Sequence, residues 1–411
     1  MKKIKMFFGL LLLSAVMVGC GGGADSDIEI VNPFVGADHQ NWQNLIDAFN
    51  ATNPTYPLRN VSMEQDAMYT RIATAAATGV GVPELAVVHA ERIAGFVALD
   101  MLRPLDDLTA PFPYINAANY IAGAWDIGAV GGARYGIPLD IHTWVMFYNR
   151  DLLNYFGVEW VLEDGIVTYD EIRQVGEIVN AAGGPATLGV TWMWPNFTSL
   201  YRQMGGNITD DGIRPTIYTP EGIAALELLH SLYMDGVTNL NGEDASQLFQ
   251  IGQLLFIPEG IWYLNVATQI EGFEWGITHT PQYNPNNLVN WSSSHQFVLL
   301  ASEERTPEQE QVIMEFIDWV RENSIEWARA GQNPAALEIL NSAEFSQMPQ
   351  SFLLATPQNQ QSLVLFEYLY NGFVSDAINR IGFDSVFGAM DIRQALQSAQ
   401  AEVEDRIAAG Q

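Results

Sequence analysis

The alternation of short apolar segments with helical segments at the start of the chain constrains the fold more than any other feature. Residues 28–32, 60–63 and 84–88 read as strands. Between them, the segment 42–50 has helical apolar spacing and the segment 66–77 reads as a helix rich in Ala. Strands that alternate with helices form an open sheet covered by helices, so the sequence predicts an α/β fold. At 411 residues the chain exceeds one ordinary domain of ~100–200 residues, and two α/β lobes with crossing connections fit this length.

Composition excludes several classes of protein. Asp and Glu number 48 against 18 Lys and Arg, which gives a net charge of −30. Binding to nucleic acid needs a basic face that neutralises phosphates, so we expect no nucleic-acid partner. Hydrophobic residues make up 48% and charged residues 16%, which excludes a mainly disordered chain. The single Cys excludes an internal disulfide and a cysteine-rich metal site.

Residues 1–19 have the pattern of a secretory signal peptide. Three Lys precede an apolar run of 13 residues from Met6 to Val18, which is too short for a comfortable membrane span. The ending MVGC resembles the lipobox of bacterial lipoproteins, although Met17 stands where Leu is usual. This resemblance implies that Cys20 carries lipid as the mature N-terminus, and plain secretion with a free thiol is the alternative. Residues 20–27 are then a flexible tether.

No lysine follows the signal segment, so the mature chain has 15 Arg and no Lys. Codon bias is one explanation. The other is an alkaline exterior, where Lys with a pKa of ~10.4 begins to lose its charge while Arg keeps it. The sequence leaves both explanations open.

Six later segments form an ordered series. They are RYGIPLDIHTWVMFYNRD from residue 134, MGGN from 204, YTPEG from 218, LFQIGQLLFIPEGIWYL from 248, WGITHTPQ from 275 and ARAGQNPA from 328. In order and spacing, the series resembles the extracellular solute-binding proteins of bacterial ABC importers, specifically the carbohydrate-binding group of the maltose-binding protein family. The resemblance covers nearly the whole mature chain, and the lipoprotein-like start supports it independently.

The resemblance implies a two-lobe periplasmic-binding-protein-like fold of type II, in which hinge strands join two α/β lobes and ligand binds in the cleft between them. Crossings between the lobes are expected near 138–142, 278–282 and 330–336. The first lobe would hold 28–139 and 282–332, and the second 140–281 and 333–411. The resemblance also implies a monomer without enzymatic activity or cofactor. It would be lipid-anchored outside the cytoplasm and would deliver a carbohydrate to the membrane permease of an ABC importer.

A sugar offers apolar C–H faces and a rim of hydroxyl groups, so its site needs flat aromatic rings beside carboxylates, amides and His. Trp262 is the strongest candidate ring, because it matches the family's glycine-then-tryptophan motif, in which the aromatic ring faces the sugar. A place in the core is the alternative for Trp262. Trp192 and Trp194 lie two residues apart in an extended segment and point to the same side. We expect one of these two rings to belong to the core.

Polar candidates lie on the first expected crossing and after a buried strand. Asp140 and His142 lie on the crossing, where the family places a polar ligand contact. His89 and Glu91 follow the strand 84–88, and ligands of open α/β sheets bind beyond the carboxyl ends of strands. The alternatives are a turn cap for Asp140, a structural role for His142 and a solvated helix start for Glu91.

A third group of candidates follows the second expected crossing. Trp291, Ser293 and His295 lie in a segment of small residues that we expect to be a loop reaching into the cleft. An ordinary exposed loop is the alternative. Asp38, in the loop after the first strand, is a weaker candidate.

Three rival functions remain open. A glycosidase needs only two carboxylates ~5–10 Å apart, although the chain has no GxSxG, Walker or HExxH motif. The six His are scattered without metal-ligand spacing, so no metal site is expected. A binding protein of the same fold for another solute is the second rival, and a sensor subunit that signals to a membrane kinase is the third.

Overall fold

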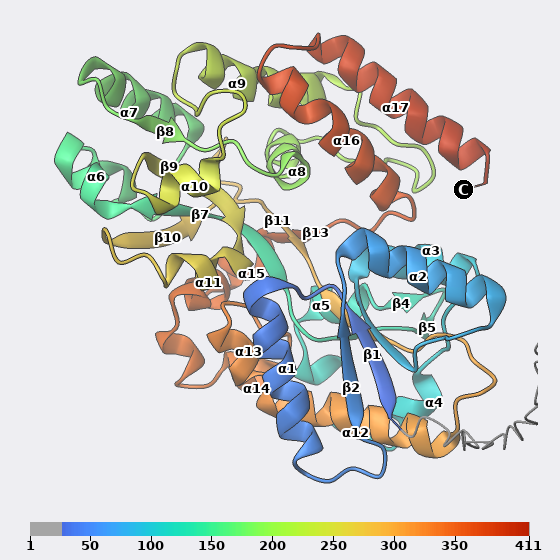
Figure 1. Cartoon of the computed structure of the whole chain (residues 1–411). Helices are drawn as coiled ribbons and strands as arrows, with labels where there is room; N and C mark the ends of the chain where they lie inside the picture. Colours follow the sequence, from blue (N-terminus) through green and yellow to red (C-terminus); the bar gives the residue numbers. More distant parts are fainter. Residues whose placement is uncertain (1–26, 411) are drawn as a thin grey trace, which may run out of the picture.

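The computed structural model describes residues 27–410, so the expectations for the signal peptide and Cys20 lie outside the described residues. Within this range the chain forms two large sheets, each covered by helices, and the two helix-covered units lie one above the other in Figure 1. The predicted α/β fold is confirmed.

The first sheet has five strands in the order β2-β1-β3-β12-β6. β1 pairs in parallel with β2 and β3, whereas β12 runs antiparallel to β3 and β6. The strands are β1 (Ile28–Asn32), β2 (Leu58–Ser62), β3 (Leu85–His89), β6 (Ile137–Pro138) and β12 (His295–Val298). Because β12 comes from a distant part of the chain, the first lobe is discontinuous in sequence.

Helices cover both faces of the first sheet, because successive side chains of each strand point to opposite faces and both sets are apolar. On β3, Leu85 and Val87 belong to the core shared with α1 and α12. Ala86 and Val88 belong to the core shared with α2. The three helices are α1 (Gly36–Asn50), α2 (Gln65–Thr78) and α12 (Pro307–Asn323).

The second sheet has the strand order β13-β11-β7-β9-β8, with β10 also paired to β7. All eight residues of β7 are buried, and its alternate side chains enter two different cores. Trp144 and Met146 belong to the core that the helices of the second lobe share, whereas Val145 and Phe147 join the core that continues into the first lobe. The strands are β7 (His142–Asn149), β8 (Ala186–Leu188), β9 (Leu254–Gly260), β10 (Trp275–His279), β11 (Asn290–Ser293) and β13 (Leu363–Leu365).

The chain first crosses from β6 to β7 through residues 139–141. It returns at Ser294, between β11 in the second sheet and β12 in the first. This return is later than the 278–282 expected from the sequence, because β11 still pairs with β7 and β13 in the second sheet. The chain passes to the second sheet once more after residue 336. Pro334 forms a β-bridge with Asp140 and Ala336 forms one with Tyr120, and the passage ends in β13.

Two local expectations need correction. Residues 291–293 are not a loop: they lie in β11, and every residue from 290 to 300 is buried. Their small polar side chains are compatible with a strand because buried groups on the neighbouring strands satisfy them, as Thr143 does for Ser292. Helix α1 begins at Gly36, before the apolar spacing starts at Trp42, because its first turns carry mainly polar, exposed residues.

The remaining helices complete the two layers. In the first lobe they are η1 (Ala90–Arg92), α3 (Ile93–Ala98), α4 (Asp106–Thr109), η2 (Ala117–Asn119), α5 (Ala122–Asp126) and α13 (Ile325–Arg329). In or near the second they are α6 (Arg150–Phe156), η3 (Glu159–Leu162), α7 (Tyr169–Ala181), α8 (Met193–Gln203), α9 (Pro220–Met234), α10 (Ala245–Gln250), η4 (Ile261–Tyr263), α11 (Leu264–Ala267), α16 (Asn371–Val386) and α17 (Ile392–Ala408). The last passage between the lobes contains α14 (Leu337–Leu340), η5 (Phe345–Gln347), η6 (Pro349–Leu354) and α15 (Pro357–Ser362). A separate two-stranded sheet is formed by β4 (Ala129–Val130) and β5 (Ala133–Arg134). Across residues 27–410, no helix combines the length and apolar character of a membrane span.

Candidate functional site

Three strand ends carry histidines to the place where the two sheets meet. His89 ends β3 and is paired directly with His295 at the start of β12. His142 begins β7 and is paired with Ser293 at the end of β11. The ring centroids lie 4.2 Å apart for His142 and His295, and 4.9 Å apart for His89 and His295. With two nearby carboxylates they form a group that we call the hinge cluster: His89, Glu91, Asp140, His142 and His295.

Asp140 is the fully buried anchor of the hinge cluster. Its carboxylate lies 2.7 Å from His295 Nδ1 and 3.3 Å from His142 Nδ1. It also accepts hydrogen bonds from the His295 backbone N–H at 3.0 Å and from Trp327 Nε1 at 2.8 Å. Burial alone would raise the pKa of Asp140, but the charge interaction with His295 and the hydrogen bonds from both His rings hold it well below its usual range. The carboxylate therefore remains ionised.

His89 and Glu91 of the hinge cluster also have hydrogen-bonding partners. Tyr69 Oη lies 2.6 Å from His89 Nδ1, and burial lowers the pKa of His89 to about 4. Burial also lowers the pKa of His142, so both rings are neutral near pH 7. Glu91 on η1 accepts a hydrogen bond from the Ser293 hydroxyl at 2.6 Å. This bond connects the first lobe to β11 of the second sheet.

Trp262 lies beside the hinge cluster, on η4 directly after β9. Its half-buried ring lies 5.9 Å from the His142 ring, 6.1 Å from Trp144 and 6.4 Å from Trp192, between ring centroids. Gly260 makes this placement possible, because a Cβ atom there would lie 2.1 Å from the indole ring. The glycine in the EGIW segment is therefore required by the tryptophan that folds back over it.

Trp192 and Trp194 have different surroundings. Trp192 immediately precedes α8 and is 56% exposed. Trp194 is buried in the second-lobe core, with its ring 6.3 Å from Phe366. The structure therefore leaves Trp192, and not Trp194, on the surface that Trp262 shares.

Glu259 is a site residue that the sequence analysis did not select. It is buried on β9, one residue before Gly260, and burial raises its pKa to about 8 although a hydrogen bond with the Trp192 side chain opposes the shift. Its Oε2 also accepts the Gly260 backbone N–H at 3.2 Å. The sequence feature that could have identified Glu259 is its position as the one carboxylate in the otherwise apolar strand LLFIPEG. We refer to Trp144, Trp192, Glu259 and Trp262 as the aromatic wall.

Asp38 lies near Asp140 of the hinge cluster, in the first turn of α1. Its carboxylate accepts hydrogen bonds from Asn265 in α11 at 2.8 Å and from Gln332 at 3.2 Å. Burial, and secondarily the charge of Asp140, raises the pKa of Asp38 to about 7. Trp291 is buried in the second-lobe core, and its ring lies 5.9 Å from His142. The structure thus brings together the predicted site residues of both lobes, whereas Trp194 packs in the core.

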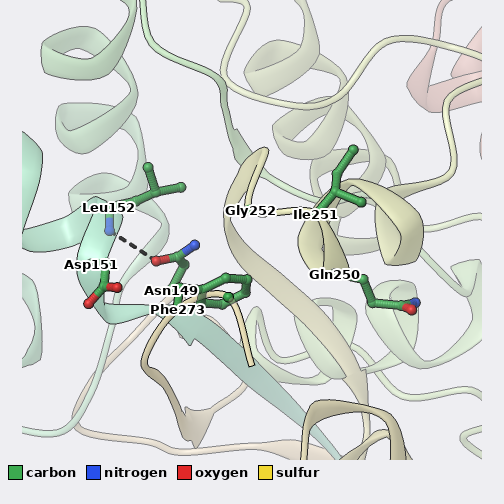
Figure 2. Close-up of a pocket in the computed structure, with 8 residues that line it drawn as sticks. Asn149, Asp151, Leu152, Gln250, Ile251, Gly252 and Phe273 are labelled. Atoms are coloured by element: carbon green, nitrogen blue, oxygen red, sulfur yellow. Dashed lines mark hydrogen bonds between the residues drawn. The ribbon is translucent and has the colours of Figure 1, made fainter. Parts of the chain in front are cut away.

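A pocket of about 380 Å³ lies elsewhere, at the far end of β7 from His142 (Figure 2). Asn149, which ends β7, lines it and caps α6 by accepting the Leu152 backbone N–H at 2.9 Å. Gly252 and Phe273 also line it, and the Phe273 ring lies beside Asn149 in Figure 2. No predicted site residue lines this pocket, so it is separate from the hinge cluster and the aromatic wall.

Sequence comparison connects the chain to known binding proteins. Residues 36–325 match the model of the family described as bacterial extracellular solute-binding protein. An arabinooligosaccharide-binding protein of Halalkalibacterium halodurans is 25% identical over 242 residues, which cover 56% of this chain and 53% of the relative. A protein of the same name from Bacillus subtilis is 25% identical over 245 residues, covering 57% and 55%. The chain therefore spans about half the length of these relatives.

Structural comparison extends over nearly the whole chain. The GacH receptor of Streptomyces glaucescens, solved unliganded and with acarbose, superposes with a TM-score of 0.78 at 15% identity and covers 92% of this chain and 97% of its own. Maltose-bound MalE3 of T. maritima gives a TM-score of 0.76 at 19% identity, covering 92% and 99%. These similarities establish the two-lobe fold of type II. Since the family model spans most of the chain, the protein belongs to the bacterial extracellular solute-binding proteins.

Proposed function

We propose that this protein is an extracytoplasmic binding protein that captures a carbohydrate between its lobes and delivers it to the permease of an ABC importer. The observation that carries the proposal is the position of Trp262, whose half-buried ring lies between the hinge cluster and the exposed Trp192. A flat apolar surface beside carboxylates and imidazoles matches the two chemical surfaces of a sugar ring. The names of the relatives, which include two arabinooligosaccharide-binding proteins, support the same class of ligand.

Hydrogen bonds between the lobes suggest how binding couples to closure. Glu91 in the first lobe accepts from Ser293, and Asp38 in α1 accepts from Asn265 in α11. When the lobes separate, these carboxylates lose their partners and become available to sugar hydroxyl groups. The ligand would then replace protein contacts with its own and favour the closed arrangement.

Trp262→Ala tests the proposal directly. The variant loses an aromatic contact and buried apolar area, which at ~25 cal/mol per Å² amounts to about 2–4 kcal/mol in binding, or roughly 30-fold to 1000-fold in Kd. Titration should use purified protein with a panel of arabino- and malto-oligosaccharides. Saturating ligand at 100 times its Kd should stabilise the wild type by about 2.7 kcal/mol.

Two results would contradict the proposal. A non-carbohydrate solute that raises the melting temperature when no sugar does so would reject the ligand class, and turnover of an oligosaccharide would indicate an enzyme. Ligand-free unfolding of Trp262→Ala is the control, because a core Trp would cost ~3–5 kcal/mol of folding stability and leave binding intact.

We also propose that Cys20 carries the lipid anchor. An acyl chain on this residue would hold the protein at the outer face of a membrane, and two or more chains would hold it stably. Membrane fractionation of the wild type and of Cys20→Ala checks this, with the variant expected in the soluble fraction. Equal release of both proteins would reject lipidation.

A further inference from the structure

The three histidines of the hinge cluster have an arrangement that the proposed function does not require. One nitrogen from each of His89, His142 and His295 lies within 4.8 Å of the other two. These rings come from β3, β7 and β12, so both sheets contribute to the group. The sequence gives no hint of it, because the three positions are far apart along the chain and show no metal-ligand spacing.

Asp140 contacts the same nitrogen of two of these rings. Its Oδ1 lies 3.3 Å from His142 Nδ1 and its Oδ2 lies 2.7 Å from His295 Nδ1, and carboxylate oxygens accept hydrogen bonds from imidazole N–H groups. In the tautomer with the proton on Nδ1, the Nε2 atom of each ring can offer its lone pair to a cation.

His89 can adopt the same tautomer. Its Nδ1 lies 2.6 Å from Tyr69 Oη, which also accepts the His89 backbone N–H at 3.1 Å. A phenol oxygen can accept both protons, which leaves Nε2 of His89 as the third lone pair. Imidazoles whose Nδ1–H is held by a carboxylate or another oxygen are the usual form of histidine ligands in metal sites.

We infer that His89, His142 and His295 bind a divalent transition-metal ion, such as zinc, through one nitrogen of each ring at the junction of the two lobes. Imidazole ligands suit zinc, copper and nickel, and three protein ligands leave a coordination position open. The carboxylate of Asp140 and the hydroxyl of Tyr69 would orient the ligands from behind. The rings of Trp262 and Trp291, each 5.9 Å from His142, would limit access of water.

The distances allow this coordination with small movements. One nitrogen of each ring lies within 4.8 Å of the other two. Three points so spaced share a position no more than about 2.8 Å from each, and Zn–N bonds are ~2.0–2.1 Å long, so coordination through these nitrogens needs each ring to shift by less than about 1 Å. Such a shift is within the range of a side-chain adjustment. Because His142 belongs to the second sheet and the other two ligands to the first, the ion would connect the lobes.

The experiment uses the purified protein without sugar, stripped of metal with a chelator, and zinc ions alone as the probe. Equilibrium dialysis should give one zinc ion per wild-type chain. His142→Asn and His295→Asn are matched variants, because the Asn amide can still donate to Asp140 while the imidazole ligand is removed. We expect each to lose at least tenfold in zinc affinity. His230→Gln is the control, since His230 lies on α9 and contacts the Val386 carbonyl instead.

Tyr69→Phe provides a second test if the Asn variants do not fold. Loss of an outer partner of a metal-bound His typically costs 10–100-fold in affinity, and we expect that range for zinc. Zinc binding that is equally tight in the His variants would place the ion on surface carboxylates and overturn the inference, as would a wild type that binds no zinc. Sugar titration is a separate measurement, so a protein that binds zinc but no sugar rejects only the proposed function.

Discussion

The hinge cluster and the aromatic wall each contain one buried carboxylate, and the two carboxylates differ in their partners. Asp140 accepts from two His rings, a backbone N–H and Trp327, and its pKa lies well below the usual range. Within residues 27–410, the donors to Glu259 are the adjacent Gly260 N–H and Trp192 alone, and burial raises the pKa of Glu259 to about 8. Burial is similar in both, so the charge interaction with His295 and the additional donors stabilise the charged form of Asp140, whereas burial dominates at Glu259. The comparison indicates that the contacts of Asp140 connect the strands of the hinge, whereas Glu259 has fewer hydrogen bonds within the protein.

Asp140→Asn should reduce the free energy of unfolding more than any other variant of the hinge cluster or the aromatic wall considered below. A small reduction would contradict the difference drawn between Asp140 and Glu259. Removing the charge leaves several buried donors with a poorer acceptor, so we expect a loss of about 3–5 kcal/mol in the free energy of unfolding. Urea unfolding of the ligand-free protein measures it. Glu259→Gln is the matched control and should change this stability by less than about 1 kcal/mol, because Gln replaces a neutral acid of the same shape. Equal losses in both variants would show that the two carboxylates have the same role.

The pH dependence of the free energy of unfolding tests whether Glu259 is protonated in the folded protein. The pKa of Glu259 rises from 4.5 to about 8 in the folded protein, so the folded state binds more protons than the unfolded state between these values. Its contribution to stability is complete below pH 4.5 and is lost as pH rises towards 8, with a slope of up to about 1.4 kcal/mol per pH unit.

The measurement is urea unfolding of the wild type and Glu259→Gln at several pH values from 5 to 8. The difference between the two proteins isolates Glu259, because Asp38 and His89 titrate in both. We expect the wild type to lose stability relative to the variant as pH rises. Parallel curves would mean that Glu259 is ionised throughout.

Trp192→Ala should have the smallest effect and tests the exposed part of the aromatic wall. Loss of this ring should weaken carbohydrate binding by about 0.5–1.5 kcal/mol, or up to roughly tenfold in Kd. Its 56% exposure predicts a change in ligand-free stability within about 0.5 kcal/mol. Trp194→Ala, which empties a core position, should instead lose ~3–5 kcal/mol of stability. Unchanged affinity in Trp192→Ala would remove this residue from the site.

The sequence by itself determined much of the local structure. A short apolar segment located β1, and an Ala-rich segment located most of α2, because these signals depend on neighbours along the chain. The glycine-then-tryptophan segment also identified Trp262 as a special position. Its physical basis is local, since the ring packs on the glycine two residues before it.

Only the tertiary structure decided which of these residues meet. The segment 291–293 became a strand because β7 and β13 pair with it, and no pattern within the segment encodes those partners. Trp192 and Trp194 have the same residue type and nearly the same position, yet α8 starts between them and sends one ring to the surface and the other to the core. His89, His142 and His295 became neighbours for the same reason. Pairing of strands that are distant in sequence sets their positions, and the burial and hydrogen bonds that follow determine their chemistry.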